Sequence, residues 1–143
     1  MPLKYFIAFT GIFFLVASPL FAKKYSSSGP SKVSLTIVFP KLDTPRGKIL
    51  LRIQNRSKDT VHQKFIPVRS DRESHTCQLQ PGSYAVAAFH DINSNAKLDR
   101  QWSGFPAEPY GFSNNVRGTL GPPSLKDQLI ELTSDRQISI RLR

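Results

Sequence analysis

Residues 91–99 form a polar run whose side chains could bind a cation. Oxygen-bearing side chains recur there at every second position, at Asp91, Asn93 and Asn95. This alternation is how a short loop wraps a hard ion such as calcium, and such loops also use one backbone carbonyl. We therefore predict a calcium-binding loop with the ligands Asp91, Asn93, Asn95, Lys97 through its carbonyl, Asp99 and Glu108.

Two positions depart from the helix-flanked calcium loops that this run otherwise matches. Ala96 stands where glycine is favoured because the turn needs a positive φ. Alanine in that conformation costs about 1 kcal/mol if the same turn forms. Trp102 stands where a bidentate glutamate normally completes the coordination. Glu108 would therefore supply the closing carboxylate. With few carboxylates, and with Lys97 and Arg100 beside them, the predicted Kd for calcium is about 10⁻⁴–10⁻³ M.

A loop without a metal is the alternative. Asn93 and Asn95 can form Asx turns, and the aspartate carboxylates can cap backbone amides instead of coordinating an ion. Zinc is not expected, because the three histidines have no metal-ligand spacing and Cys77 is a lone thiol. The apolar residues that alternate around Cys77 indicate a small buried side chain.

Catalytic motifs are absent from the sequence. It contains no Gly-x-Ser-x-Gly elbow, no His-Glu-x-x-His and no phosphate-cradling glycine loop. His90 ends a predicted strand and Asp91 follows it; adjacent residues of a strand point to opposite faces, so these two side chains cannot converge without a bulge. We predict that the protein is not an enzyme; the alternative is a periplasmic hydrolase that acts through the carboxylates of Asp91, Asp99 and Glu108.

Aromatic residues follow the polar run. Trp102, Phe105, Tyr110 and Phe112 are interleaved with glycine and proline. Such residues can form an exposed platform for a sugar or a peptide, or they can pack a long loop down on a sheet. The sequence leaves both interpretations open.

The N-terminal end is typical of an exported protein. Lys4 precedes an apolar run over residues 5–16, and Ala22 offers a small residue for cleavage. We expect a signal peptide over residues 1–22, a disordered lead-in over 23–32 and one domain over 33–143. The run is shorter than the roughly 20 residues of a membrane span, so no transmembrane segment is expected after cleavage. Leu20 fits the cleavage rule poorly, which leaves an uncleaved anchor as the alternative.

The formal net charge of +10 is large for this length, and scattered bases are typical of a solvated surface; the functional alternative is attraction to anionic partners. The bases are scattered along the chain, and no recognition helix, zinc finger or aromatic-basic platform accompanies them, so nucleic acid is not expected. For a periplasmic or secreted protein, the expected partner is an envelope protein or an anionic glycan or lipid. With a single cysteine, no disulfide can form within the chain.

Hydrophobic residues recur with period two along most of the chain, which predicts strands. The predicted strands cover residues 33–39, 48–54, 61–68, 75–79, 83–90, 125–132 and 137–142, of which 125–132 could begin with a short helical turn. Turn residues at 43–47 predict that the first two strands form a hairpin. The strand over 83–90 is apolar on both faces and should be central.

Residues 91–124 have almost no periodicity. Loops longer than about 15 residues are uncommon in a compact domain and are usually functional, disordered or held by other groups. The pattern as a whole predicts an all-β protein, an antiparallel β-sandwich of about seven strands with one long ordered loop.

Three sequence blocks resemble a bacterial family of exported proteins, the domain of unknown function 2141 (DUF2141). The blocks are LQPGSYAVAAFHDINSNAKLD at 79–99, GFPAEPYGFSNN at 104–115 and GPPSLKD at 121–127. The resemblance covers residues 33–143, with Ala96 in place of the family's usual glycine and Pro109 in place of the glycine that usually follows Glu108.

The resemblance implies a small sandwich, prealbumin-like or immunoglobulin-like, in the periplasm or outside the cell, with no established activity. Its motifs carry over to one polar cluster at the end of the sandwich, formed by Asp91, Asn93, Asn95, Asp99, Glu108, Ser113 and Asn114. Together these features predict an uncharacterised, exported, non-catalytic binding or structural module of the bacterial envelope.

Overall fold

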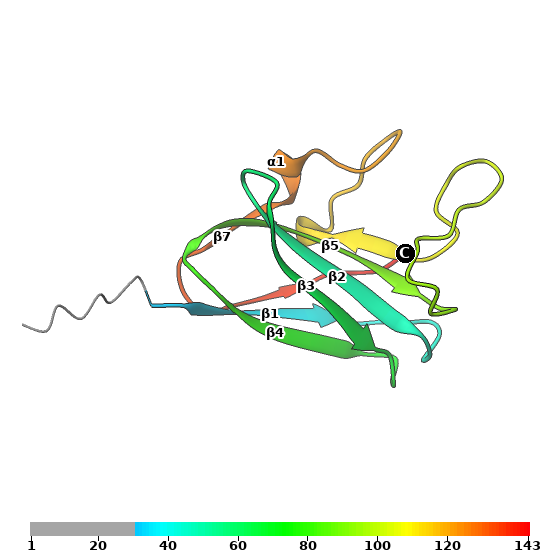
Figure 1. The fold of residues 1–143 in the computed structure, drawn as a ribbon, viewed down its shortest axis with the longest axis horizontal. Coiled ribbons are helices and arrows are strands. Elements are labelled where there is room, and N and C mark those ends of the chain that lie inside the picture. The colour runs from blue at the N-terminus through cyan, green and yellow to red at the C-terminus, as the bar shows by residue number, and fades with distance from the viewer. Residues whose placement is uncertain (1–30) are drawn as a thin grey trace, which may run out of the picture.

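The computed structural model describes residues 31–143, which form two packed β-sheets (Figure 1). The predicted signal peptide (1–22) and most of the lead-in (23–32) lie outside the described residues. The elements are β1 (Val33–Phe39), β2 (Lys48–Asn55), β3 (Thr60–Pro67), β4 (Glu73–Leu79), β5 (Gly82–Asp91), β6 (Tyr110–Phe112), the 3₁₀ turn η1 (Ser113–Asn115), α1 (Leu125–Gln128), β7 (Leu129–Leu132) and β8 (Arg136–Ser139).

The smaller sheet has the order β4-β1-β8, and the larger has the order β3-β2-β5-β6 with β7 also paired to β5. All pairs are antiparallel except β1 with β8, which is parallel. The prediction of an all-β sandwich is confirmed. The described residues contain eight strands where the sequence predicted about seven.

One layer of apolar side chains lies between the sheets. Leu35, Ile37 and Phe39 of β1 are fully buried, and Ile49 and Ile53 of β2 face them from the opposite sheet. These are the alternate residues that the period-two pattern assigned to one face of each strand. Burying such a side chain contributes about 1.5–3 kcal/mol, which makes this layer the main source of stability.

The predicted hairpin between residues 33–39 and 48–54 is wrong. β1 pairs with β4 and β8, while β2 pairs with β3 and β5 in the other sheet. Residues 40–47 therefore cross from one sheet to the other. The crossing brings the apolar faces of both strands onto the same core, whereas a hairpin would place the strands side by side in one sheet.

The two sides of the sandwich are closed differently. On one side, the C-terminal residues cross between the sheets: the Ile140 amide donates to the Val38 carbonyl at 2.9 Å, and Arg143 exchanges hydrogen bonds of 3.1 Å with Tyr110. On the other side, the edge strands β3 and β4 lie next to each other without backbone pairing (Figure 1). We call this the open side.

The long irregular stretch over residues 91–124 contains more structure than its sequence indicates. Residues 110–112 form the short strand β6, which pairs with residues 87–89 of β5, and the 3₁₀ turn η1 follows at once. A three-residue strand is too short to show a periodicity, so the sequence analysis missed it. β6 divides the stretch into two loops, residues 92–109 and 116–124.

Gly47 lies where the crossing segment passes under the polar loop. Its φ is +78°, and a Cβ there would lie 2.3 Å from the Asp91 carbonyl oxygen. We predict that Gly47→Ala lowers the free energy of unfolding by more than about 2 kcal/mol, because a left-handed backbone and a backbone clash both penalise the methyl group.

Gly104→Ala is the matched control for this measurement by urea denaturation. Gly104 has a similar φ of +85°, but a Cβ there meets nothing within 4 Å. Only the conformational cost of about 1 kcal/mol should remain. Equal losses in the two variants would contradict the steric argument.

Candidate functional site

Asp91 ends β5 and is fully buried at the point where the chain leaves the sheet. Its Oδ1 accepts a hydrogen bond from the Asn95 amide at 3.0 Å, and its Oδ2 accepts one from the Ala96 amide at 2.8 Å. A buried carboxylate needs such donors, because leaving it unpaired is costly. Asp91 therefore fixes the first turn of the polar loop.

Glu108 holds the far end of the same loop and is also buried. Its Oε1 accepts from the Ile92 amide at 2.9 Å, and its Oε2 accepts from the Asp99 amide at 3.2 Å. The Ala107 amide donates to the Asp99 carbonyl at 2.7 Å. These bonds hold both ends of residues 92–99 against residues 107–108.

The two asparagines form Asx turns. Asn93 Oδ1 accepts from the Asn95 amide at 3.1 Å, and Asn95 Oδ1 accepts from the Lys97 amide at 2.8 Å. Their side-chain amides donate to the Asp99 carboxylate at 2.7–3.2 Å. Ala96 has a φ of 63°, so it makes the left-handed turn for which glycine is favoured. The alternative interpretation, Asx turns with carboxylates on backbone amides, describes this geometry.

Calcium at this loop stays a prediction. The structure brings the side chains of Asp91, Asn93, Asn95, Asp99 and Glu108 into one hydrogen-bonded group, while the Lys97 side chain is exposed. Across residues 31–143, no group of three or more His, Cys, Asp or Glu side chains is placed to hold a metal ion. A calcium ion would therefore have to share oxygens that already accept hydrogen bonds from amide groups.

Ser113 and Asn114 do not join this group, which corrects the single polar cluster that the resemblance implied. The buried Ser113 hydroxyl accepts from the Val86 amide at 3.0 Å and lies in hydrogen-bond contact with the Gln128 carbonyl. The Asn114 side chain donates to the carbonyls of Asp127 and Leu129 at 2.9 and 3.1 Å. Both side chains fasten η1 to β5 and α1, and thus have a structural role.

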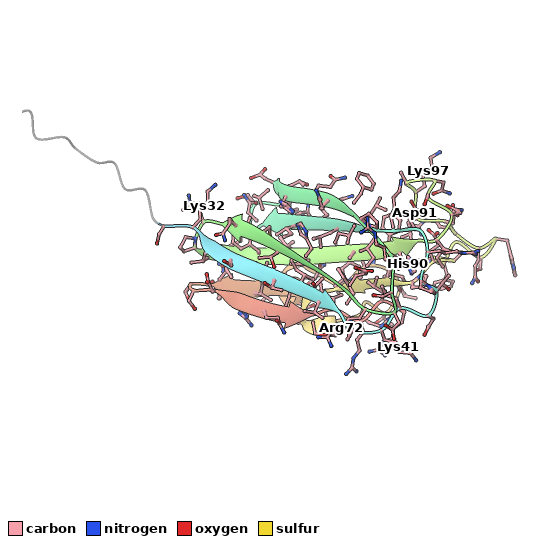
Figure 2. All side chains as sticks on the ribbon, turned by 90° about the horizontal axis from the view of Figure 1, so that it is seen from below. Lys32, Lys41, Arg72, His90, Asp91 and Lys97 are labelled. Atoms are coloured by element: carbon pink, nitrogen blue, oxygen red, sulfur yellow. The ribbon has the colours of Figure 1, made fainter. Side chains whose placement is uncertain are left out.

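His90 helps to position the polar loop. It is buried beside Asp91, and its Nε2 lies 2.7 Å from the Arg46 carbonyl oxygen, to which it donates. This bond ties the crossing segment to the end of β5. Figure 2 shows His90, Asp91 and Lys97 near one end of the sandwich, with Lys32 at the other end.

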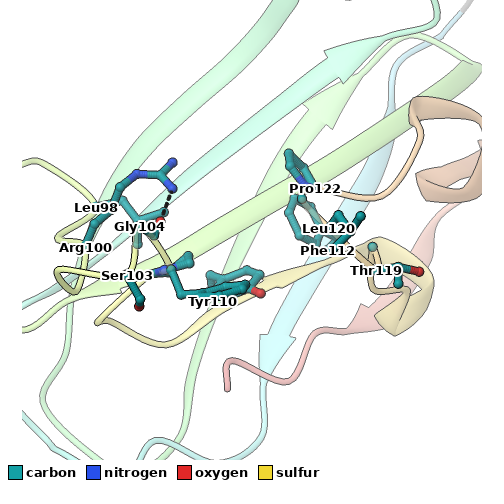
Figure 3. A pocket seen from close by; sticks show the side chains of 13 residues that line it. Leu98, Arg100, Ser103, Gly104, Tyr110, Phe112, Thr119, Leu120 and Pro122 are labelled. Carbon is teal, nitrogen blue, oxygen red and sulfur yellow. Dashed lines mark hydrogen bonds between the residues drawn. The ribbon is translucent and has the colours of Figure 1, made fainter.

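A cavity of about 330 Å³ lies between the two loops that flank β6 (Figure 3). Its lining is mostly apolar: Leu98, Phe105, Pro106, Tyr110, Phe112, Leu120 and Pro122, with Arg100, Ser103 and Thr119 and the glycines at 104, 118 and 121. It continues onto the outer face of the larger sheet, where Leu50 and Phe89 lie beside Tyr110. Cavities of this size and character are typical of ligand sites.

Large apolar side chains stand exposed on both loops around this cavity. Trp102 is fully exposed, and the exposed fractions are 94% for Leu120 and 61% for Phe105. Of the two interpretations of the aromatic residues, the exposed platform fits Trp102 and Phe105. Tyr110 and Phe112 are half-buried on the sheet, as the packing interpretation predicted.

Positive charge surrounds the cavity. The Arg100 guanidinium donates to the Gly104 carbonyl at 2.8 Å, and the Arg117 guanidinium lies 5.3 Å from the centre of the Tyr110 ring. Lys97 is exposed on the first of the two loops, next to Leu98 of the cavity lining. The nearest acids, Asp99 and Glu108, accept hydrogen bonds from the loop itself. The basic groups at this end are therefore available to an anionic ligand.

Cys77 lies away from this end, in β4. Its thiol is buried and lies 3.8 Å from the Leu35 carbonyl oxygen, and burial raises its pKa. The interpretation of Cys77 as a small buried residue is confirmed. Within residues 31–143, the structure contains no helix of the length and hydropathy that would cross a bilayer.

The fold and the site define a small β-sandwich domain with a polar, self-bonded loop and an apolar cavity at its end. The chain belongs to the DUF2141 family: the model of that family, described as "Uncharacterized protein conserved in bacteria", matches residues 37–140. This match confirms the resemblance seen in the three sequence blocks. No curated protein and no solved structure matches the chain.

Sequence reasoning missed Leu98 and Leu120 as cavity residues. Leu120 follows a Gly-Thr pair and precedes Gly-Pro-Pro, a composition that indicates only a loop. The available signal was a single leucine in a glycine- and proline-rich segment, where no core strand or helix could bury it. Only the fold brings this segment beside residues 98–106.

We predict that Asp91→Asn lowers the free energy of unfolding by about 1–3 kcal/mol, the cost of an unsatisfied buried donor. Asparagine keeps one acceptor oxygen but turns an NH₂ group toward the second backbone amide. Asp99→Asn should cost less, about 0.5–1 kcal/mol, because its donors are side chains that can turn to water. Urea denaturation compares the two, and a larger loss for Asp99→Asn would contradict this ranking.

We also predict a weak, calcium-specific rise in melting temperature. Ligand binding to the folded state adds about 2.7 kcal/mol of stability at a hundredfold excess over Kd. The measurement compares EDTA with calcium up to about 10 mM, the concentration range that the predicted Kd requires, and uses magnesium as the control. A response that is flat, or that persists in Asp91→Asn, would rule out the predicted site.

Proposed function

We propose that this chain is an exported, non-catalytic binding module that docks on the anionic lipid surface of the bacterial envelope. The contact surface consists of residues 98–106 and 118–122, which we call the two docking loops. The observation that carries the proposal is the exposure of Trp102, Phe105 and Leu120 on these loops. Large apolar side chains gathered on a surface commonly mark sites that bind a protein, a membrane or a ligand.

The exposed aromatic side chains of the docking loops suit a lipid–water interface. Tryptophan and other aromatic side chains favour that interface, where the ring is partly in the apolar region and the polar edge remains hydrated. The cavity between the docking loops can take an apolar portion of a lipid, because its lining is mainly aliphatic and aromatic. Few polar side chains line it, which favours a lipid over a glycan as its occupant.

The charge at the same end supplies the preference for anionic lipids. Each lysine or arginine close to such a surface contributes about 1 kcal/mol. Lys97, Arg100 and Arg117 lie on or beside the docking loops. The chain's net charge of +10 adds a long-range attraction toward the surface.

A non-catalytic role is supported by the state of the loop carboxylates. Asp91 and Glu108 are buried, and their oxygens accept hydrogen bonds from backbone amides. These carboxylates thus hold the loop that carries Lys97 and leads to Trp102. The signal-like sequence over residues 1–22 supports export.

The fluorescence of Trp102, the only tryptophan, provides the test. Titration with phosphatidylglycerol vesicles should shift its emission to the blue, because the exposed ring enters a less polar medium. Leu120→Asp should abolish the shift, and the high exposure of Leu120 means that the fold should not depend on it. Lys97→Gln should weaken binding roughly fivefold, which corresponds to the loss of about 1 kcal/mol.

Lys32→Gln is the matched control, since it removes one positive charge at the opposite end of the sandwich (Figure 2). It should leave vesicle binding nearly unchanged. Equal binding to neutral phosphatidylcholine vesicles, or no shift with phosphatidylglycerol, would overturn the proposal. Loss of binding in Lys32→Gln equal to that in Lys97→Gln would show that the docking loops are not the contact surface.

A further inference from the structure

Two histidines bridge the open side of the sandwich, away from the docking loops. His62 belongs to β3, the edge of the larger sheet, and His75 belongs to β4, the edge of the smaller one. Each lies at an inward position of its strand, opposite Ile53 and Ile37 respectively. Both side chains are half-buried, so solvent reaches them.

The two imidazoles meet at their Nε2 atoms, which lie 2.9 Å apart. The ring centroids are 5.1 Å apart and the ring planes differ by 21°. The nitrogens are therefore the points of contact, and the rings do not overlap face to face. One Nε2 carries a hydrogen and the other accepts it, which requires opposite tautomers in the two rings.

We propose that the His62 and His75 Nε2 atoms form a binding site for a borderline divalent transition metal such as Zn²⁺, Cu²⁺ or Ni²⁺. Neutral imidazole nitrogen is a preferred ligand of these ions. With metal–nitrogen bonds of about 2.0–2.1 Å, two nitrogens on adjacent coordination positions lie roughly 2.9–3.4 Å apart. The observed spacing is already at the lower end of that range.

Metal binding at this pair needs little chemical rearrangement. The ring that donates from Nε2 moves its hydrogen to Nδ1, and both lone pairs then face the metal without net release of a proton. Burial lowers the pKa of both histidines, which favours the neutral imidazole form that coordinates a metal. The two Nε2 atoms now face each other, so both rings must also turn until their lone pairs aim at one point beside the N···N line.

The charge of Lys64 should lower the metal affinity of this site. Lys64 lies on β3 and its charge also lowers the pKa of both histidines. The same positive charge repels a bound cation, so this site should be weaker than an isolated pair of histidines. Water completes the coordination sphere, because no third His, Cys, Asp or Glu stands with this pair among the described residues.

A metal at this place would join the free edges of the two sheets. β3 and β4 have no backbone pairing with each other, and the C-terminal crossing closes only the opposite side. Coordination would replace one hydrogen bond with two metal–nitrogen bonds across the same gap. Occupancy should therefore stabilise the sandwich against separation of these edges.

The test uses the full chain, loaded with one equivalent of Cu²⁺ for electron paramagnetic resonance and with Zn²⁺ for thermal unfolding. The expected results are a copper spectrum with hyperfine splitting from two imidazole nitrogens and a Zn²⁺-dependent rise in melting temperature. Both signals should be lost in His62→Gln and in His75→Gln. Glutamine can still donate a hydrogen bond across the gap, and melting in EDTA verifies that each variant is folded.

Lys64→Gln provides a gain-of-affinity variant, and Lys32→Gln removes the same charge far from the pair. We expect Zn²⁺ affinity to increase severalfold in Lys64→Gln and to stay unchanged in Lys32→Gln. A metal response that survives in both histidine variants would place the site elsewhere and overturn the proposal. No two-nitrogen spectrum with Cu²⁺, or a Zn²⁺ affinity insensitive to Lys64, would overturn it as well.

Discussion

The structure depends on the burial of one layer of apolar side chains between two sheets. Because strands from both sheets share this layer, the chain must cross from sheet to sheet several times, as residues 40–47 do between β1 and β2. Each crossing leaves backbone amides without strand partners at an edge or an end of the sandwich. Burying an amide without a hydrogen-bond partner costs about as much free energy as the burial of one core side chain contributes. The crossings therefore dictate where polar side chains lie.

The polar loop after β5 has the same need for amide partners, although it joins β5 to β6 within the larger sheet and crosses no gap between sheets. Asp91 and Glu108 place carboxylates inside the protein, where they accept hydrogen bonds from the amides of Ile92, Asn95, Ala96 and Asp99. The spacing that suggested calcium is therefore also the spacing that lets a short loop satisfy its own backbone. Both solutions use oxygen atoms at alternate positions, which is why the sequence pattern alone could not separate them.

The parts of the fold that could be predicted are those that depend on local patterns. Alternation identified the inward residues Leu35 and Ile49, because side-chain direction in a strand has period two. Pairing could not be predicted in the same way: β1 and β2 look like a hairpin until the shared core is considered. β6, with three residues, is too short for any pattern. The polar loop was found from its composition, whereas the contact of His62 with His75 depends on which two strand edges meet.

The polar loop and the docking loops differ in how their side chains are satisfied, and this difference has a physical reason. Residues 92–99 satisfy their polar groups internally, so this segment can be rigid without help from a ligand. The docking loops do the reverse, since Trp102 and Leu120 remain in water although burying either would contribute about 1.5–3 kcal/mol. Hydrogen bonds of Asp99 with Ala107 and Glu108 hold the start of residues 98–106, while Trp102 and Leu120 remain exposed. A surface that covered these side chains would gain the burial energy that folding did not use.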